Sequence, residues 1–432
     1  MLKLALIANS KDSLTGFFDF FKENKDKIKK LTAQEIEITY ILNFSDEKET
    51  DFYSESEFNR VEITADYQKI LVEAEVDIIL DLTRTNSSPD YLLQALKQKK
   101  AVITTNVKVI AENYLEIKKT EEKFQSKLFF AAAFSPLHLD SLINSFYALD
   151  ELKELNAILN ATTNYILSEM EKRTISMKET IEQAKEFSYT EENLDLDLNG
   201  VDSLDKLILL ADLIYNTELD PSIIKAKGIK GITSYDLIYA AELGYKIKLI
   251  CTIKKENENL YLGIRPNLIP KDSFLATINE NSNGIELFSK YSGKTTLKVE
   301  NSDSAAVNLL NLDLIKAANF IENKKQLIFE DQFEDQFKEK DVFDLYQEQQ
   351  SSFYVRLQIE KDEKIIEEIK KIFSEKNLAD LILHDDSTET PLLPIIIMTK
   401  KIKEKDLEKL LEEVEALEGV LTVNNIIAVK AG

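Results

Sequence analysis

The chain is 432 residues long and carries 54 lysine and arginine residues against 77 aspartate and glutamate residues, a formal net charge of −23 at pH 7. This acidity opposes nonspecific binding to nucleic acid or anionic lipid, so neither is expected as a partner. Apolar residues make up 44% of the chain, which supports packed cores in about three domains. No apolar run reaches the ~18 residues of a membrane span, and the N-terminus reads as a first strand rather than a signal peptide.

Cysteine, histidine and glycine are all scarce. A single cysteine, Cys251, excludes an internal disulfide, favours a reducing cytoplasm and is expected in a core. With only His138 and His384 in addition, no metal site is predicted, and His384 is expected at the surface. Ten glycines leave few places for the backbone loops that wrap phosphates.

Residues 1–135 alternate between strand-like and helix-like segments. Strands are expected at Leu2–Ala8, Glu35–Leu42, Val76–Leu82 and Ala101–Thr105, and helices over Gly16–Ile28 and Pro89–Lys99. This alternation predicts an α/β domain, with a parallel sheet and helices on its faces.

Residues 136–304 indicate an α+β substrate domain. Its expected helices are Thr162–Arg173, Met177–Phe187 and the very apolar Val201–Tyr215. Its expected strands are Leu155–Leu159, Lys246–Lys254, Leu260–Pro266, Gly284–Ser289 and Thr295–Val299. A further helix over 305–321 is expected to return to the first domain.

The rest of the chain divides at an acidic stretch. Residues 322–350 have the composition of a solvated linker with one or two short docking segments. Residues 351–432 follow the order strand–helix–strand–strand–helix–strand, which predicts a ferredoxin-like unit. Its expected elements are Phe353–Ile359, Glu363–Phe373, Leu378–His384, Pro394–Thr399, Lys405–Leu417 and Val420–Val429.

The densest group of ionisable residues lies at Ser188–Lys206. Asp202 and Lys206 are four residues apart at the start of an apolar helix, so they face the same side. A structural interpretation has Asp202 cap the helix, Asp205 lie at its positive end and Lys206 pair with Asp202. A functional interpretation is a carboxylate cluster that holds an ammonium group beside a lysine that supplies a proton.

Two further segments are open to both kinds of interpretation. In NATTNYIL, either Thr162 or Thr163 caps a helix, or the segment from Asn160 to Asn164 forms a polar ledge facing a cleft. The loop after the first strand, IANSKDSLTGFF, contains only Gly16 and no G-x-G-x-x-G. Lys11 in this loop remains able to contact a phosphate as a point charge.

Several ordered segments make the chain resemble homoserine dehydrogenase along nearly its whole length. ILNATTNYILSEMEK (Ile158–Lys172) is similar to a strand–helix signature of that family, and YTEENLDLDLNGVDSLDKLILLA to its substrate-site block. The segments Val102–Asn113, Lys227–Ile250 and Asn267–Asn279 follow the same order and spacing.

The resemblance implies reduction of aspartate semialdehyde to homoserine with NADP or NAD, in the biosynthesis of threonine and methionine. It makes Lys206 the catalytic proton donor and Glu191 the carboxylate nearest the substrate amino group. Asp197 and Asp202 line the same pocket. On the cofactor side it points to Thr104 and Asn106, with Ser10 and Lys11 as weaker candidates. It also implies a Rossmann-like first domain, a C-terminal ACT regulatory domain and a homo-oligomer, a dimer or tetramer.

Departures from the family pattern fall on the cofactor side. The phosphate-loop glycines are absent, and Val107 replaces a second lysine. Lys108 is adjacent, but on a strand or tight turn it is expected to point elsewhere. Ala132, Ala133 and Phe134 replace a glycine triplet near the nicotinamide, and Leu128 replaces a carboxylate that helps to bind sodium.

Two functions therefore remain open at this point. A diverged dehydrogenase is favoured because the whole architecture is retained. The alternative is a catalytically impaired relative that senses a small amino acid. The loop Ile359–Ile366 lacks glycine, which argues against threonine binding by the C-terminal unit and favours a role in dimerisation.

Overall fold

The computed structural model describes the chain except for residues 9–10, 44–60, 73–74, 84–87, 135–136, 138, 140–142, 144–146, 148–149, 187–193, 218, 323–338, 385–391 and 431–432. The chain divides into two compact units. The first is Met1–Asp150, Ile208–Glu218 and Glu300–Gln336, and the second is Glu151–Leu207, Leu219–Val299 and Phe337–Gly432. In the described part of the chain, no helix is both long and apolar enough to cross a bilayer.

Six parallel strands form the sheet of the first unit, in the order β3-β2-β1-β4-β5-β6. They are β1 (Leu2–Ala8), β2 (Ile36–Asn43), β3 (Glu62–Thr64), β4 (Ile78–Asp81), β5 (Ala101–Thr104) and β6 (Lys127–Phe129). The strand order reverses between β1 and β4, which is the order of a Rossmann fold. The predicted parallel sheet is confirmed, and ligands of such sheets bind outside the carboxyl ends of the strands at that reversal.

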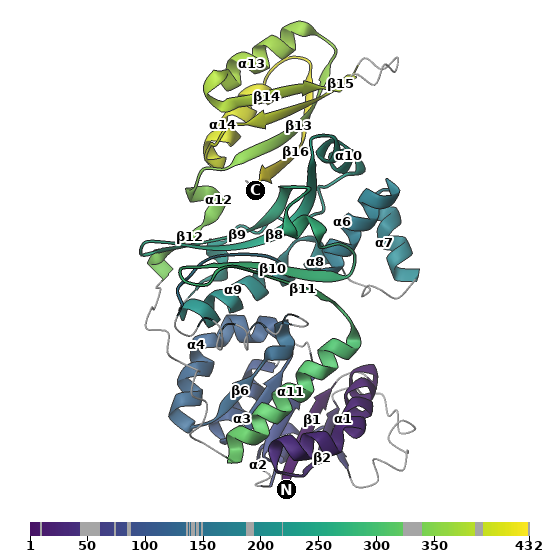
Figure 1. The fold of residues 1–432 in the computed structure, drawn as a ribbon, viewed down its shortest axis with the longest axis vertical. Helices are drawn as coiled ribbons and strands as arrows, with labels where there is room; N and C mark the ends of the chain where they lie inside the picture. Colours follow the sequence, from purple (N-terminus) through teal and green to yellow (C-terminus); the bar gives the residue numbers. More distant parts are fainter. Residues whose placement is uncertain are drawn as a thin grey trace. The chain divides into compact units, whose positions relative to one another are not determined.

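Helices cover this sheet (Figure 1). They are α1 (Lys11–Thr32), α2 (Tyr67–Val72), α3 (Ser88–Lys97), α4 (Val107–Phe124) and α11 (Asp303–Glu322). Helix α1 extends beyond the predicted Gly16–Ile28 because its apolar positions recur at helical spacing from Leu14 onward and are buried in one core. Helix α11 packs against α1 and adds Leu309 and Leu314 to the same core.

The expectation of a strand or tight turn around Lys108 is wrong. Val107–Phe124 is an α-helix, and its N-cap is Asn106, whose side chain accepts a hydrogen bond from the Val109 backbone N–H at 3.3 Å. The β-branched residues at 107, 109 and 110 favour strand locally, but the cap and the buried face of the helix outweigh that preference.

A mixed sheet organises the second unit. Its central strands are β7 (Leu152–Ile158), β8 (Tyr245–Glu256), β9 (Asn259–Pro270), β10 (Ser282–Ser289) and β11 (Gly293–Glu300). These strands lie in the order β11-β10-β7-β8-β9, and the pairs β10–β7, β7–β8 and β8–β9 run antiparallel. The helices are α6 (Ala161–Arg173), α7 (Met177–Glu186), α8 (Asp195–Leu198), α9 (Val201–Tyr215) and α10 (Ser234–Glu242), and α9 continues into the first unit.

The C-terminal residues form a ferredoxin-like layer. Strands β13 (Ser352–Glu360), β14 (Leu378–Leu383), β15 (Leu392–Thr399) and β16 (Val420–Val429) lie in the order β16-β13-β15-β14. Helices α13 (Glu363–Asn377) and α14 (Glu404–Glu415) pack against each other (Figure 1). This confirms the predicted strand and helix order.

The ferredoxin-like layer shares one continuous sheet with the central strands. Strand β16 pairs in parallel with β9, with Ala428 opposite Asn267 and Val429 opposite Leu268. Within the stretch predicted as a linker, β12 (Val342–Asp344) also pairs with β9, and α12 (Leu345–Glu348) follows it.

Two buried ion pairs fasten this layer to the rest of the second unit. Arg265 on β9 forms a bidentate pair with Glu404 at the start of α14, at 3.0 and 2.7 Å. Arg356 on β13 binds Asp236 on α10, with its Nε 2.7 Å from Oδ1. Because a buried charge that loses its partner is strongly destabilising, these pairs hold the layer in a defined position within the unit.

Candidate functional site

A lysine and an aspartate form an ion pair on the first turns of α9. The Lys206 ammonium donates to Asp202 Oδ2 at 2.8 Å and to the backbone carbonyl of Leu159 at 3.3 Å. The Lys206 side chain is 17% exposed and the Asp202 side chain 31%, so both groups remain within reach of a small molecule. Beyond Lys206 the helix is apolar and buried from Leu207 to Ala211.

The predicted pairing of Asp202 with Lys206 is confirmed, but Asp202 does not cap the helix. Helix α9 begins at Val201, so Asp202 lies in its first turn. Its carboxylate instead accepts hydrogen bonds from Lys206 and from the side chain of Asn160. The predicted core position of Cys251 is also confirmed, and burial raises the pKa of its thiol to about 12.

Asn160 joins two carboxylates from different helices. Its Nδ2 donates to Asp197 Oδ1 at 2.6 Å and to Asp202 Oδ2 at 2.8 Å. Its Oδ1 accepts from the Thr163 backbone N–H at 2.8 Å, which makes Asn160 the N-cap of α6. The expectation that Thr162 or Thr163 caps this helix is therefore wrong. The alternative interpretation, a polar ledge from Asn160 to Asn164 that faces a cleft, stays a prediction.

The short helix α8, which carries Asp197, is held by the segment that follows α9 in the chain. The Ile229 backbone N–H donates to the Leu198 carbonyl oxygen at 2.8 Å. A Cβ at Gly228 would lie only 1.9 Å from that same oxygen, so this close approach requires glycine. This close approach holds α8, and with it Asp197, against the segment Lys227–Ile250.

A buried lysine that sequence reasoning missed lies elsewhere in this unit. Lys248 on β8 donates to Asn164 Oδ1 at 2.8 Å, to the Ile278 carbonyl at 2.6 Å and to Asn279 Oδ1 at 3.2 Å. Burial lowers the pKa of its ammonium to about 7. The alternation of side chains along the strand could have predicted its burial, since Lys246 and Lys248 lie on one face and α6 contacts this strand.

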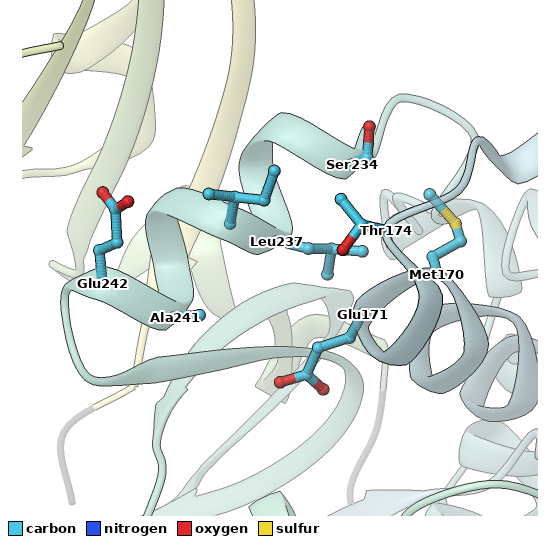
Figure 2. Close-up of a pocket in the computed structure, with 8 residues that line it drawn as sticks. Met170, Glu171, Thr174, Ser234, Leu237, Ala241 and Glu242 are labelled. Carbon is cyan, nitrogen blue, oxygen red and sulfur yellow. The ribbon is translucent and has the colours of Figure 1, made fainter. Parts of the chain in front are cut away.

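A pocket of about 380 Å³ lies between α10 and the C-terminal end of α6. Figure 2 shows Glu171 of α6 and Thr174, the C-cap of α6, facing Leu237 and Ala241 of α10. Asn160 caps the opposite end of α6, about 20 Å away along the 13 residues of the helix. The pocket is thus separate from the cluster around Lys206.

The expectation of a surface position for His384 is wrong. Its ring stacks on Tyr239 of α10 with the centroids 4.0 Å apart, and its side chain is only 18% exposed. A Glu242 oxygen lies 3.6 Å from Nε2. The sequence does not show that the end of β14 packs against α10. His138 lies outside the described residues.

In the first unit, polar side chains gather where β4 and β5 end. The buried Asp81 carboxylate accepts from the hydroxyls of Thr83 at 2.6 Å and Thr104 at 3.0 Å. The Thr104 hydroxyl in turn accepts from the Asn106 backbone N–H at 3.1 Å. Thr104 and Asn106, both predicted on the cofactor side, therefore lie together at the carboxyl edge of the sheet, beside the N-terminus of α4.

Other predicted residues can be placed only in part. Glu191 and Ser10 lie outside the described residues, and Lys11 is the first residue of α1, with its side chain outside the description. Lys108, on α4 rather than a strand, lies 3.9 Å from Glu112. Phe134 is buried in a 3₁₀ turn at Ala131–Phe134.

The first unit fits a dinucleotide in its topology. A Rossmann sheet binds such a cofactor at the edge where β1 and β4 end, and here a helix N-terminus capped by Asn106 lies beside that edge. Gly16 does not serve a phosphate loop, because its Cα faces Val307 of α11, with a Cβ built there 3.6 Å from Val307 Cγ2. Among the described residues, the groups at this edge that could contact a phosphate are the N-terminus of α4 and the polar side chains beside it.

The fold and the cluster together define an α/β oxidoreductase: a dinucleotide-binding domain and a second domain that presents a lysine among carboxylates. Two family models, homoserine dehydrogenase over residues 139–307 and the homoserine dehydrogenase NAD-binding domain over residues 15–131, match about two thirds of the chain. The chain belongs to the homoserine dehydrogenase family.

Individual relatives agree with this assignment. The chain is 23% identical to homoserine dehydrogenase from Neisseria gonorrhoeae over 92% of both chains. It is 32% identical to the enzyme from Methanocaldococcus jannaschii over 47% of this chain and 61% of that one. Among solved structures, a homoserine dehydrogenase from Thiobacillus denitrificans matches with a TM-score of 0.87 at 18% identity, covering 99% of this chain and 98% of that one. That likeness shows the shared fold.

Proposed function

We propose that this chain is a homoserine dehydrogenase, which interconverts L-aspartate 4-semialdehyde and L-homoserine with a nicotinamide dinucleotide. The observation that carries the proposal is the cluster of Lys206, Asp202, Asp197 and Asn160, because it joins a proton donor to two carboxylates. The family match over both units supports the dehydrogenase over the amino-acid sensor.

The carboxylates of Asp197 and Asp202 are the groups that bind the substrate ammonium, with Glu191 as a third. A small amino acid held by its ammonium places its reacting carbon, C4, a few ångströms away, within reach of the Lys206 side chain. The Asp202 carboxylate and the Leu159 carbonyl fix the direction of the Lys206 ammonium. Such prior orientation lowers the entropic cost of proton transfer.

Lys206 moves the proton in both directions. In reduction, a proton leaves the Lys206 ammonium for the aldehyde oxygen while the aldehyde carbon gains a hydride, and the product is the primary alcohol. In oxidation, the neutral Lys206 amine takes the hydroxyl proton as the carbon loses hydride. The dinucleotide, when bound, supplies or accepts that hydride.

Thr104 and Asn106 are the proposed cofactor contacts, with Ser10 and Lys11 toward the phosphates. The Asp81 carboxylate accepts a hydrogen bond from the Thr104 hydroxyl and so fixes the position of Thr104 at the carboxyl edge of the sheet. A neighbour of known structure, an archaeal homoserine dehydrogenase in complex with NADPH, shares the fold at a TM-score of 0.61 and 17% identity. We propose NADP or NAD as the cofactor.

We further propose that the ferredoxin-like layer is an ACT-like regulatory unit and that the chain is a homo-oligomer, a dimer or tetramer. Strand β14 is the last strand of the larger sheet. A strand at the edge of a sheet can pair with a strand of a second copy of the chain. Light scattering on the purified chain measures the oligomeric state. A cytoplasmic location stays a prediction from the single cysteine.

The function is tested by measuring homoserine-dependent reduction of NADP or NAD by the purified chain, together with a fluorescence titration of NADPH and NADH. The dehydrogenase predicts saturable binding of at least one reduced dinucleotide and turnover with homoserine. An amino-acid sensor predicts neither, but thermal stabilisation by homoserine alone. The second pattern would overturn the proposal.

A further inference from the structure

We propose that Asn160 is a positioning residue of this reaction: its side-chain amide holds Asp197 and Asp202 together and, through Asp202, sets the direction of the Lys206 ammonium. The inference rests on the proposed function, in that Lys206 is taken as the proton donor. It assigns Asn160 a role that differs from helix capping, although the same side chain does both.

The two N–H groups of the Asn160 amide have two carboxylate acceptors. One is Asp197 on α8 at 2.6 Å, and the other is Asp202 on α9 at 2.8 Å. These aspartates lie 37 and 42 residues further along the chain. Two carboxylates brought together in a partly buried place repel each other. A donor shared between them offsets that repulsion and fixes their separation.

The orientation of the amide is determined by its other end. Asn160 Oδ1 accepts the Thr163 N–H at 2.8 Å, and the Thr163 hydroxyl donates back to the Asn160 carbonyl at 3.1 Å. The side chain is therefore held with its oxygen toward the helix and its nitrogen toward the carboxylates. Because Asn160 is only 5% exposed, water has little access with which to replace the amide.

One oxygen connects the amide to the proton donor. Asp202 Oδ2 accepts from Asn160 Nδ2 at 2.8 Å and from Lys206 Nζ at 2.8 Å. If the Asn160 N–H is lost, this oxygen is free to rotate away, and the Lys206 ammonium moves with it. A displacement of ~1 Å at a reacting group can lower a rate about 10²-fold.

The substitution Asn160→Asp separates this role from capping. Aspartate caps a helix about as well as asparagine, so α6 keeps its N-terminal bond. It has the same shape but no N–H, and it places a third carboxylate against the other two. One of the three then binds a proton at higher pH than an isolated aspartate does.

We expect Asn160→Asp to lower kcat for homoserine oxidation about 10²-fold at neutral pH and to regain activity relative to the unaltered chain as the pH falls, when a proton replaces the lost N–H. The conservative variant Asn160→Ser keeps the cap but has a single donor, so we expect an intermediate kcat without that gain at low pH. A role in capping alone predicts an unchanged kcat for Asn160→Ser, the variant that adds no charge to the cluster.

A second measurement does not depend on turnover. Since the folded Asn160→Asp variant binds its extra proton with a raised pKa, its stability relative to the unaltered chain falls as the pH rises through that value. Thermal unfolding should therefore show a larger deficit at pH 8 than at pH 5. An equal deficit at both pH values, or an unchanged kcat and pH profile, would overturn the inference. Inactivity of the unaltered chain toward homoserine would instead contradict the proposed function.

Discussion

Two asparagines, one in each unit, cap a helix directly after a strand, and their surroundings differ. Asn160 follows β7 and caps α6, and its amide reaches two carboxylates beside Lys206. Asn106 follows β5 and caps α4 beside Asp81, whose carboxylate is bound by threonine hydroxyls. The proposed substrate site has charged groups that can act on a ligand. At the proposed cofactor site the Asp81 carboxylate accepts hydrogen bonds from neighbouring side chains and so fixes their positions.

We infer from this comparison that departures from the family pattern affect the proposed substrate site and the proposed cofactor site differently. The proposed proton donor, Lys206, depends on a few groups, and its ammonium is held by hydrogen bonds to Asp202 and to the Leu159 carbonyl. Dinucleotide binding is spread over the carboxyl edge of a whole sheet and the helix termini beside it. Single glycines can be lost there while the fold that presents the edge is retained.

The largest expected effect follows from removing the proposed proton donor, Lys206. Lys206→Ala should lower kcat for homoserine oxidation by about 10²–10⁴-fold, the usual contribution of a general acid or base. Lys230→Ala is the matched control, because Lys230 also contacts an aspartate, Asp195, at 2.8 Å in the same unit but is 46% exposed. Steady-state assays of both variants check this. Comparable activity of the two variants would contradict the role of Lys206.

The next effect concerns the support of α8. Gly228→Ala places a Cβ against the Leu198 carbonyl and should displace Asp197, lowering kcat/KM about 10²-fold. Gly231→Ala in the same segment is the control, since its Cβ would meet nothing nearer than Asn425 Oδ1 at 3.9 Å. Steady-state kinetics of the two variants measure the difference. Equal kcat/KM values would show that α8 does not need this close approach.

A smaller effect is expected at the cofactor edge. Thr104→Val removes the hydroxyl between Asp81 and the Asn106 N–H. An unsatisfied buried group costs about 1–3 kcal/mol, and we expect the KM for the dinucleotide to rise about tenfold while the KM for homoserine changes little. Initial rates measured against each substrate in turn separate the two constants. A change in the homoserine KM alone would contradict the assignment of Thr104 to the cofactor site.

The smallest effect on turnover is expected for Lys248→Met, which should act on stability instead. Burial holds the Lys248 pKa at about 7 in the folded chain, with Lys246, Glu171 and Lys298 as the charged neighbours. The unfolded value is about 10.4. Between these values the unfolded chain binds one more proton, so this residue makes stability rise with pH.

Chemical denaturation across that pH range checks the Lys248 prediction. The free energy of unfolding of the unaltered chain should rise relative to that of Lys248→Met from pH 7 to about pH 10, by at most ~1.4 kcal/mol per pH unit. Parallel curves would mean that Lys248 keeps an ordinary pKa. Activity at neutral pH is expected to be similar in both proteins, because Lys248 lies outside the cluster around Lys206.

Local sequence patterns were sufficient for most of the strands and for the pairing of Asp202 with Lys206. Both depend on short-range periodicity, of two residues in a strand and about four in a helix. The ferredoxin-like order could be predicted for the same reason, since each of its elements has a clear pattern.

The remaining features depend on contacts between distant segments. The bridge from Asn160 to Asp197 and Asp202 requires three segments to meet, and no local pattern encodes it. Helix α4 was missed because valine and isoleucine favour strand locally, while its cap at Asn106 is visible only once the strand end is placed. The burial of Lys248 likewise follows from tertiary packing.

The most direct test of the account is a crystal structure of the purified chain with homoserine bound. The account predicts the homoserine ammonium within about 3 Å of a carboxylate oxygen of Asp197 or Asp202, and the homoserine hydroxyl at a similar distance from Lys206 Nζ. Homoserine bound in the second unit with its hydroxyl away from Lys206, and its ammonium on other groups, would contradict it.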